Sequence, residues 1–106
     1  MANNNYPLPV EIEHTLADLA GRIALRRRML GLTQADLARQ VGIGLSSVVA
    51  LERGAPGVAL GTLGRVLWGL NCLEHLDAVA ALEPSDALLE ERIDDVPKRI
   101  RSRKRP

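Results

Sequence analysis

The sequence predicts an all-α fold. Apolar side chains recur at helical spacing along most of the chain, and the alternating pattern typical of β-strands is absent. Apolar residues make up 46% of the 106 residues, which is enough to build one core at this length. Tyr6 and Trp68 are the only aromatic residues, so we expect an aliphatic core in a single domain.

The first predicted helix begins near Val10 or Glu11 and ends at Met29. Residues 1–10 contain three Asn and two Pro, and we expect them to form a loose arm. Acidic residues in the first turn favour the start of this helix. Its apolar stripe is expected to contain Leu16, Ala20, Ile23 and Leu30.

Arg27 falls on this apolar stripe, where a charged side chain needs a partner. Glu52 carries the opposite charge and lies beside Leu51 on the expected inner face of a later helix. We therefore expect a partly buried Arg27–Glu52 ion pair that ties the two helices together. The alternative is that Arg27 extends over the apolar surface and reaches water.

Two short helices with a tight turn between them are predicted in the middle of the chain. The first covers residues 33–40, and its Thr33 and Asp36 form a pair similar to a capping box. Gly42 is suited to end it in the left-handed conformation. The second starts near residue 44 or 45 and ends at Arg53. This arrangement is typical of a helix-turn-helix.

Residue types across this stretch have the fixed spacings of a known family: Leu32, Thr33, Gln34, Leu37, Ala38, Gly42, Val48, Leu51, Glu52 and Gly54. The pattern resembles the Cro/phage-repressor (XRE) helix-turn-helix family over roughly residues 16–80. The resemblance implies a five-helix, repressor-like domain that places its second motif helix in the major groove of double-stranded DNA. In this family an arginine and a glutamate at the positions of Arg27 and Glu52 form a pair.

The resemblance also implies which residues contact DNA. Thr33 and Gln34 start the first motif helix, where unpaired N–H groups and the Gln34 amide suit a phosphate oxygen. Arg53 is placed for a second phosphate contact. The base-reading positions of the family match Gly44, Leu45, Ser46 and Ala50.

These base-reading positions lack the long polar side chains that are usual in the family. Ser46 and its neighbour Ser47 can form hydrogen bonds, whereas Leu45 offers apolar contact, for example to a thymine methyl group. No arginine, asparagine or glutamine is available there for a bidentate base contact. We therefore expect either modest specificity or a contribution from DNA shape.

A further helix is predicted from about Leu60 to Leu70. Its expected core stripe consists of Leu60, Leu63, Leu67 and Leu70. Apolar residues that lie off this stripe exceed the needs of one small core and favour a homodimer. We expect the dimer interface to contain Val66, Trp68, Leu73 and Leu76. The alternative is that the next segment of the same chain covers this surface.

One more helix is predicted over residues 72–82, with Asn71 as its cap. A short dimer-forming strand over residues 72–78 is the alternative, because the polar–apolar alternation there is brief. We expect residues 11–82 to form the DNA-binding and dimerisation domain, and residues 83–106 to form an acidic segment and a basic tail.

The charges fall into blocks although the net charge is only +1. Residues 1–73 carry +2, residues 74–95 carry −7 and residues 96–106 carry +6. Such blocks indicate different partners. Residues 87–93 are expected to form a helical turn or two, and the basic tail to be disordered in isolation. The tail is expected either to bind DNA or a protein, or to serve only solubility.

The sequence gives no support for catalysis, a cofactor or a metal. Paired carboxylates, a Cys–His or Ser–His arrangement and a glycine-rich phosphate loop are missing. His14 and His75 lie far apart in the sequence and have no obvious metal-ligand partners. The lone Cys72 predicts no disulfide and a reducing, cytoplasmic compartment. We expect neither a signal peptide nor a membrane span.

A second resemblance concerns the partners of the protein. Residues 54–63 and 68–71 are similar to HipB-type antitoxins, which pair with HipA-type kinase toxins. It implies a homodimer that represses its own operon at an inverted-repeat operator and neutralises a HipA-like kinase. A stand-alone phage-type repressor without a toxin partner is the alternative.

Overall fold

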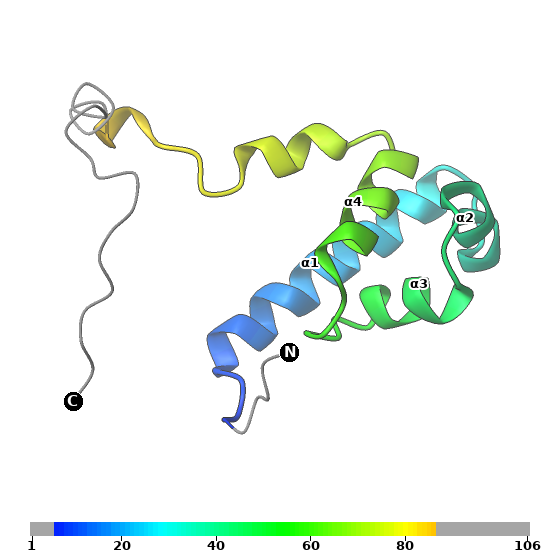
Figure 1. Ribbon diagram of the computed structural model, residues 1–106, viewed down its shortest axis with the longest axis horizontal. Coiled ribbons are helices and arrows are strands. Elements are labelled where there is room, and N and C mark those ends of the chain that lie inside the picture. The colour runs from blue at the N-terminus through cyan, green and yellow to red at the C-terminus, as the bar shows by residue number, and fades with distance from the viewer. Residues whose placement is uncertain (1–5, 87–106) are drawn as a thin grey trace.

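The computed structural model describes residues 6–86 of the chain. Within them, α-helices are followed by two short 3-10 helices, and no residue lies in a strand (Figure 1). The elements are α1 (Val10–Met29), α2 (Gln34–Val41), α3 (Leu45–Glu52), α4 (Leu60–Gly69), η1 (Leu73–Ala78) and η2 (Pro84–Asp86). The predicted all-α class is confirmed, as are the four α-helices to within a residue or two at their ends.

The helices enclose an aliphatic core. α2 contacts both α3 and α4, α1 contacts α3, and η1 packs on α4. In Figure 1 the chain leaves α4 and leads away from the other helices through η1 and η2. All buried residues except Ala20 form a single cluster: Ile23, Leu37, Ala38, Val41, Val48, Leu51, Val66, Leu67, Leu70 and Cys72.

Both ends of α2 are formed as the sequence predicts. The Thr33 hydroxyl accepts a hydrogen bond from the Asp36 N–H at 3.0 Å, and the Asp36 carboxylate accepts one from the Thr33 N–H at 2.9 Å. This capping box satisfies two N–H groups that the helix itself leaves unpaired. Gly42 ends the helix with φ 74°, in the left-handed region that favours glycine.

Gly54 lets the end of α3 approach α1 closely. Its φ is 79°, and a side chain there would lie 3.4 Å from the backbone of Ala17 in α1. The left-handed backbone would strain any larger residue, whereas its Cβ would touch α1 only at an ordinary contact distance. α3 is held against α1 at this end, which matters for the ion pair described below.

The predicted core stripe of α4 is confirmed at Leu63, Leu67 and Leu70 and is wrong at Leu60. Val66 is 0% exposed, whereas Leu60 is 75% exposed. Leu60 is the first residue of the helix, and the residues that face the core follow the i, i+3, i+4, i+7 spacing of a buried stripe: Leu63, Val66, Leu67 and Leu70. Val66 is therefore buried in the core of the monomer and cannot line a dimer interface.

The predicted α-helix over residues 72–82 does not form. η1 has only six residues, and the chain is extended at Val79 with φ −66° and ψ 125°. Asn71 adopts a left-handed φ of 61° instead of capping a helix. Leu76 is the residue of η1 that packs against the core, and one such contact does not sustain a longer helix. The alternative of a short strand is also wrong, since these residues are in a 3-10 helix.

Two regions of the chain for which the sequence predicts a conformation lie outside the described residues. They are residues 1–5 of the N-terminal arm, and residues 87–106, which contain the helical turn expected at 87–93 and the basic tail. The described part of the arm, Tyr6–Pro9, is not helical, and Pro9 precedes the first residue of α1.

Candidate nucleic-acid interface

α3 turns one face to the core and the other to solvent. Val48 and Leu51 are buried, while Leu45, Ser46 and Val49 are exposed. Of the other base-reading positions predicted from the sequence, Gly44 is exposed, and Ser47 and Ala50 are half-buried. The exposed face thus combines hydroxyl groups with aliphatic side chains and carries no acidic group.

Val49 is a surface residue of α3 that the sequence interpretation missed. It lies four residues after Leu45, so the two side chains share one side of the helix. Both are exposed. The i, i+4 spacing from a predicted base-reading position was the signal that could have identified it.

The N-terminus of α3 has no side-chain cap. Gly44 is the N-cap residue, and the first turn contains no acidic residue. The Gly44 carbonyl accepts hydrogen bonds from the N–H groups of Ser47 and Val48. The N–H groups of Leu45 and Ser46 have no acceptor among residues 6–86. A helix start of this kind attracts an anion such as a DNA phosphate.

A hollow of about 400 Å³ joins the start of α3 to the loop before α4. Ser46, Ser47 and Ala50 line one side, and Val58 and Thr62 are among the residues on the other. α4 also begins without a side-chain cap. The loop between α3 and α4 therefore extends the surface that the sequence assigned to α3 alone.

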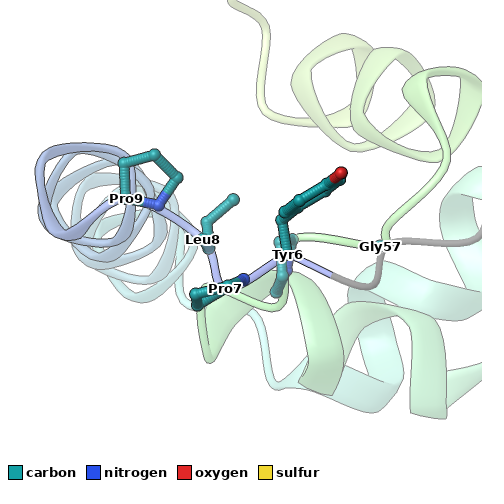
Figure 2. A pocket seen from close by; sticks show the side chains of 6 residues that line it. Tyr6, Pro7, Leu8, Pro9 and Gly57 are labelled. Atoms are coloured by element: carbon teal, nitrogen blue, oxygen red, sulfur yellow. The ribbon is translucent and has the colours of Figure 1, made fainter.

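The N-terminal segment lies beside the same loop. A second hollow of about 520 Å³ is lined by Tyr6–Pro9 on one chain segment and by Pro56 and Gly57 of the loop (Figure 2). The segment Tyr6–Pro9 and the α3–α4 loop therefore border one continuous region of the surface.

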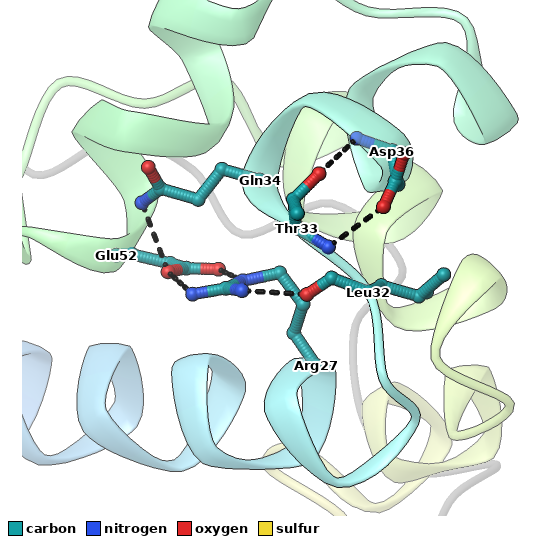
Figure 3. Close-up of polar contacts among 6 residues, drawn as sticks. All are labelled: Arg27, Leu32, Thr33, Gln34, Asp36 and Glu52. Atoms are coloured by element: carbon teal, nitrogen blue, oxygen red, sulfur yellow. Dashed lines mark hydrogen bonds and ion pairs between the residues drawn. The ribbon is translucent and has the colours of Figure 1, made fainter.

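α2 begins very differently from α3. The Thr33 hydroxyl and the Asp36 carboxylate are both occupied by the capping box (Figure 3). The hydrogen bond from the Thr33 N–H holds the pKa of Asp36 below its ordinary value, so a negative charge sits at this helix start. The Gln34 Nε2 donates to Glu52 Oε1 at 3.1 Å. The predicted phosphate contacts Thr33 and Gln34 thus have their side chains engaged within the protein.

Arg27 and Glu52 form a bidentate ion pair (Figure 3). Arg27 Nε donates to Glu52 Oε2 at 2.7 Å, and Nη2 donates to Oε1 at 2.9 Å. The third guanidinium nitrogen, Nη1, donates to the Leu32 carbonyl at 2.7 Å. The two side chains are only 11% and 5% exposed, and the hydrogen bond to Glu52 raises the pKa of Arg27. This network joins α1, α2 and the end of α3.

Arg53 follows directly after the network. It is exposed and caps α3 through its backbone N–H, which donates to the carbonyls of Val49 and Ala50. Its guanidinium has no ion-pair partner in the described part of the chain. The side chain is thus available for a phosphate, as the sequence predicts.

The residues predicted for a dimer interface do not share one environment. Trp68 is 59% exposed, which is unusual for a tryptophan, and Leu73 is exposed as well. Leu76 is partly buried against the core. With Val66 in the core, Trp68 and Leu73 are the members of the predicted set that offer apolar surface to a second chain.

Metal-ligand clusters and membrane-spanning helices are not found among residues 6–86. No group of three His, Cys, Asp or Glu side chains there is arranged to hold a metal ion. Cys72 is buried, and burial raises the pKa of its thiol, so it behaves as a small apolar core residue. No helix in this range is long and apolar enough to cross a membrane.

Comparison with known proteins points to the same region. The profile of the Helix-turn-helix family matches residues 23–70. The chain is 36% identical over 58 residues to an uncharacterised HTH-type transcriptional regulator, y4mF, from Sinorhizobium fredii (strain NBRC 101917 / NGR234). The aligned part covers 55% of this chain and 76% of that protein. No solved structure matches the chain significantly.

Proposed function

Because the chain belongs to the helix-turn-helix family of transcriptional regulators, we propose that it represses transcription by placing the start of α3 in the major groove of double-stranded DNA. The observation that supports this most is the construction of α3. Its first turn is uncapped, free of acidic residues and exposed, while its last residue is fixed by the Arg27–Glu52 network. A rigid helix with an open N-terminus suits a polyanionic duplex.

We assign base reading to the exposed face of α3. Ser46 and Ser47 supply hydroxyl groups, and Leu45 and Val49 supply apolar contact to thymine methyl groups. Gly44 and Ala50 are small, which lets the helix approach the base edges closely. With so few polar groups on this face, sequence-dependent DNA shape contributes to specificity.

We assign phosphate contacts to Arg53 and to the start of α2. Arg53 has no ion-pair partner among the described residues, so its charge is available. Gln34 contributes through its backbone N–H, or through its side-chain amide if that group leaves Glu52. These contacts position the protein on the duplex without reading its sequence.

The operator is expected to be an inverted repeat that a homodimer reads. A two-fold dimer places its two recognition helices about one helical turn apart, roughly 34–36 Å. Trp68 and Leu73 are the exposed apolar residues from which such a dimer can gain contact area.

Fluorescence anisotropy with an inverted-repeat duplex from upstream of the gene tests the proposal. Arg53→Ala should weaken binding to all sequences about equally and lower the salt slope by about one. Leu45→Ala and Ser46→Ala should instead change the sequence preference. The two kinds of variant control each other. Arg53→Ala should leave the sequence preference unchanged, and Leu45→Ala and Ser46→Ala should leave the salt slope unchanged. Tight binding that is independent of salt would contradict the proposal.

A toxin partner is the second part of the proposal. Its support is the similarity of residues 54–63 and 68–71 to HipB-type antitoxins, together with the exposure of Trp68 in the second of these segments. A HipA-like kinase encoded beside the gene should co-purify with this protein. If no neighbouring product does so, the chain is better described as a stand-alone repressor.

A further inference from the structure

Two adjacent hollows lie along the side of α1 that carries Arg22 and Arg26. The larger has a volume of about 490 Å³, and the smaller, which reaches His75 in η1, has about 240 Å³. Arg22, Arg26 and Leu70 line both of them. We refer to the two hollows together as the α1 groove.

The α1 groove has an apolar wall that the described chain leaves uncovered. Met29 is 78% exposed, and Leu25 and Leu30 beside it are also exposed. The guanidinium groups of Arg22 and Arg26 form no ion pair with any residue between 6 and 86. Exposed aliphatic surface next to unpaired positive charge fits a segment that is both apolar and acidic.

The chain itself contains such a segment after η1. Residues 79–86, which we call the acidic arm, expose Val79 and Leu82 and carry the carboxylates of Glu83 and Asp86. The arm contains no lysine or arginine. None of its residues belongs to the core cluster, so its apolar side chains have no partner in the described monomer.

We propose that the acidic arm of one copy docks in the α1 groove of a second copy. None of residues 79–86 lines either hollow of its own chain, and in Figure 1 the chain leads from η1 to η2 away from the end of α1. A reciprocal exchange fills both grooves and closes a two-fold dimer. Val79 and Leu82 meet the aliphatic wall, while Glu83 and Asp86 face Arg22 and Arg26.

This inference deepens the proposed function and rests on it, because the proposed function requires a dimer that reads an inverted repeat. The exchange does not cover the proposed DNA-binding surface. The groove residues lie on α1, α4 and η1, whereas the hollow beside Ser46 is lined by α3, α4 and their loop. The groove also continues toward Trp68, because Asn71 borders both the larger hollow and a small one beside Trp68. The arm contact and the proposed Trp68 contact are therefore neighbours at Asn71.

A charge-swap experiment on the full chain tests the exchange in the absence of DNA. One variant reverses the groove, Arg22→Glu/Arg26→Glu, and the other reverses the arm, Glu83→Arg/Asp86→Arg. At micromolar concentration and low salt, sedimentation velocity should show a dimer for the wild type and a shift to monomer for each variant alone. An equimolar mixture should recover the dimer, because each reversed groove then meets a reversed arm.

Two controls make the result decisive. Arg28→Glu/Arg39→Glu carries the same change of charge at exposed positions outside the groove and should remain dimeric. Recovery in the mixture also excludes misfolding, since a variant that fails to fold is not rescued by mixing. A monomeric wild type, or a mixture no more dimeric than its components, would overturn the exchange. Because no DNA is present, either result leaves the assignment of α3 to DNA to be judged by the anisotropy experiment.

Discussion

The two ends of α3 are built in opposite ways. At its C-terminal end, the Glu52 carboxylate is almost fully buried and accepts three hydrogen bonds, two from Arg27 and one from Gln34. At its N-terminal end, Gly44 offers no side-chain cap and Leu45 is exposed. The difference shows how a short helix can be fixed by side-chain hydrogen bonds at one end while its other end keeps open N–H groups at the surface.

α2 extends the comparison, because it begins the way α3 does not. Thr33 and Asp36 satisfy its first N–H groups and place a carboxylate beside them. The two helices have the same length, so length does not explain the contrast. The start of α2 is thus capped by side chains of its own helix, whereas the start of α3, which is proposed to enter the major groove, is uncapped. The experiments below change each end in turn.

Breaking the fixed end of α3 should have the largest effect. Arg27→Met and Glu52→Gln should each lower the free energy of unfolding by about 3–5 kcal/mol, because each leaves the opposite charge buried without its partner. The double variant should cost clearly less than the two single variants added together. Urea unfolding followed by circular dichroism measures all of these values.

The exposed Arg39–Asp36 pair provides a matched control for this cycle. Its nitrogen and oxygen lie 2.6 Å apart, but the Arg39 side chain is largely exposed. Arg39→Met should therefore cost at most about 1 kcal/mol. If Arg27→Met proves as mild as Arg39→Met, then the network does not fix α3.

Removing the cap of α2 should have an intermediate effect. Thr33→Ala deletes the hydroxyl that accepts the Asp36 N–H and should cost about 1 kcal/mol of unfolding free energy. Thr15→Ala, at an exposed position within α1, should change it by no more than about 0.5 kcal/mol. Thermal unfolding separates the two values, and equal effects would show that the capping box adds nothing to stability.

The sequence predicted the helices of the motif well because local signals define them. The Thr33–Asp36 pair marked the start of α2, and Gly42 marked its end. Arg27 and Glu52 are far apart in the sequence, yet each broke the apolar pattern of its helix, and the structure joins them in one ion pair. A charge on an apolar stripe is itself a signal, because it demands a partner.

Tertiary packing determines the features that the sequence did not predict, namely which residues of α4 are buried and what Gln34 contacts. The orientation of α4 depends on how it lies on α2, where Gly69 packs so closely that a side chain would overlap Val41. With α4 in this orientation, the Val66 side chain faces the core and the Leu60 side chain faces solvent. The hydrogen bond from Gln34 to Glu52 likewise depends on the placement of α2 and α3 relative to each other. Periodicity within one helix reports neither kind of contact.

Acid should weaken the cap of α2 and leave the start of α3 unchanged. The hydrogen bond from the Thr33 N–H keeps the pKa of Asp36 below its ordinary value, so the folded state binds a proton less readily than the unfolded state. The stability that this carboxylate contributes is present above its ordinary pKa of about 3.9, and it is lost as the pH falls through the lower folded value. Comparison of the wild type with Asp36→Asn by urea unfolding should show a stability difference that is constant above about pH 5 and shrinks as the pH falls to about 3.9 and below. A difference that stays constant through the acid range would show that Asp36 does not act through its charge.

Closing the open end of α3 should have the smallest effect on stability and a clear effect on DNA binding. Gly44 has φ −71° and ψ 150°, and a side chain there would meet only the Ser46 hydroxyl, at an ordinary contact distance of 3.7 Å. Asparagine or aspartate at this position can therefore cap the helix, which should raise the free energy of unfolding by no more than a few tenths of a kcal/mol, on the order of the difference between these residues and glycine at an N-cap. Both variants should bind the operator more weakly, because the added side chain occupies the open N–H groups and stands where the start of α3 is proposed to approach the bases.

The pair of variants also separates the cap from its charge. Gly44→Asp adds a carboxylate at the helix start that is proposed to enter the major groove of the negatively charged duplex, whereas Gly44→Asn adds a side chain of nearly the same size without charge. The aspartate variant should therefore lose more affinity than the asparagine variant, and the gap between them should narrow as salt is raised, since salt screens the repulsion. Anisotropy titrations at two salt concentrations measure this gap. If both variants bind as tightly as the wild type, the start of α3 does not face DNA, and the contrast between the two ends of the helix has another cause.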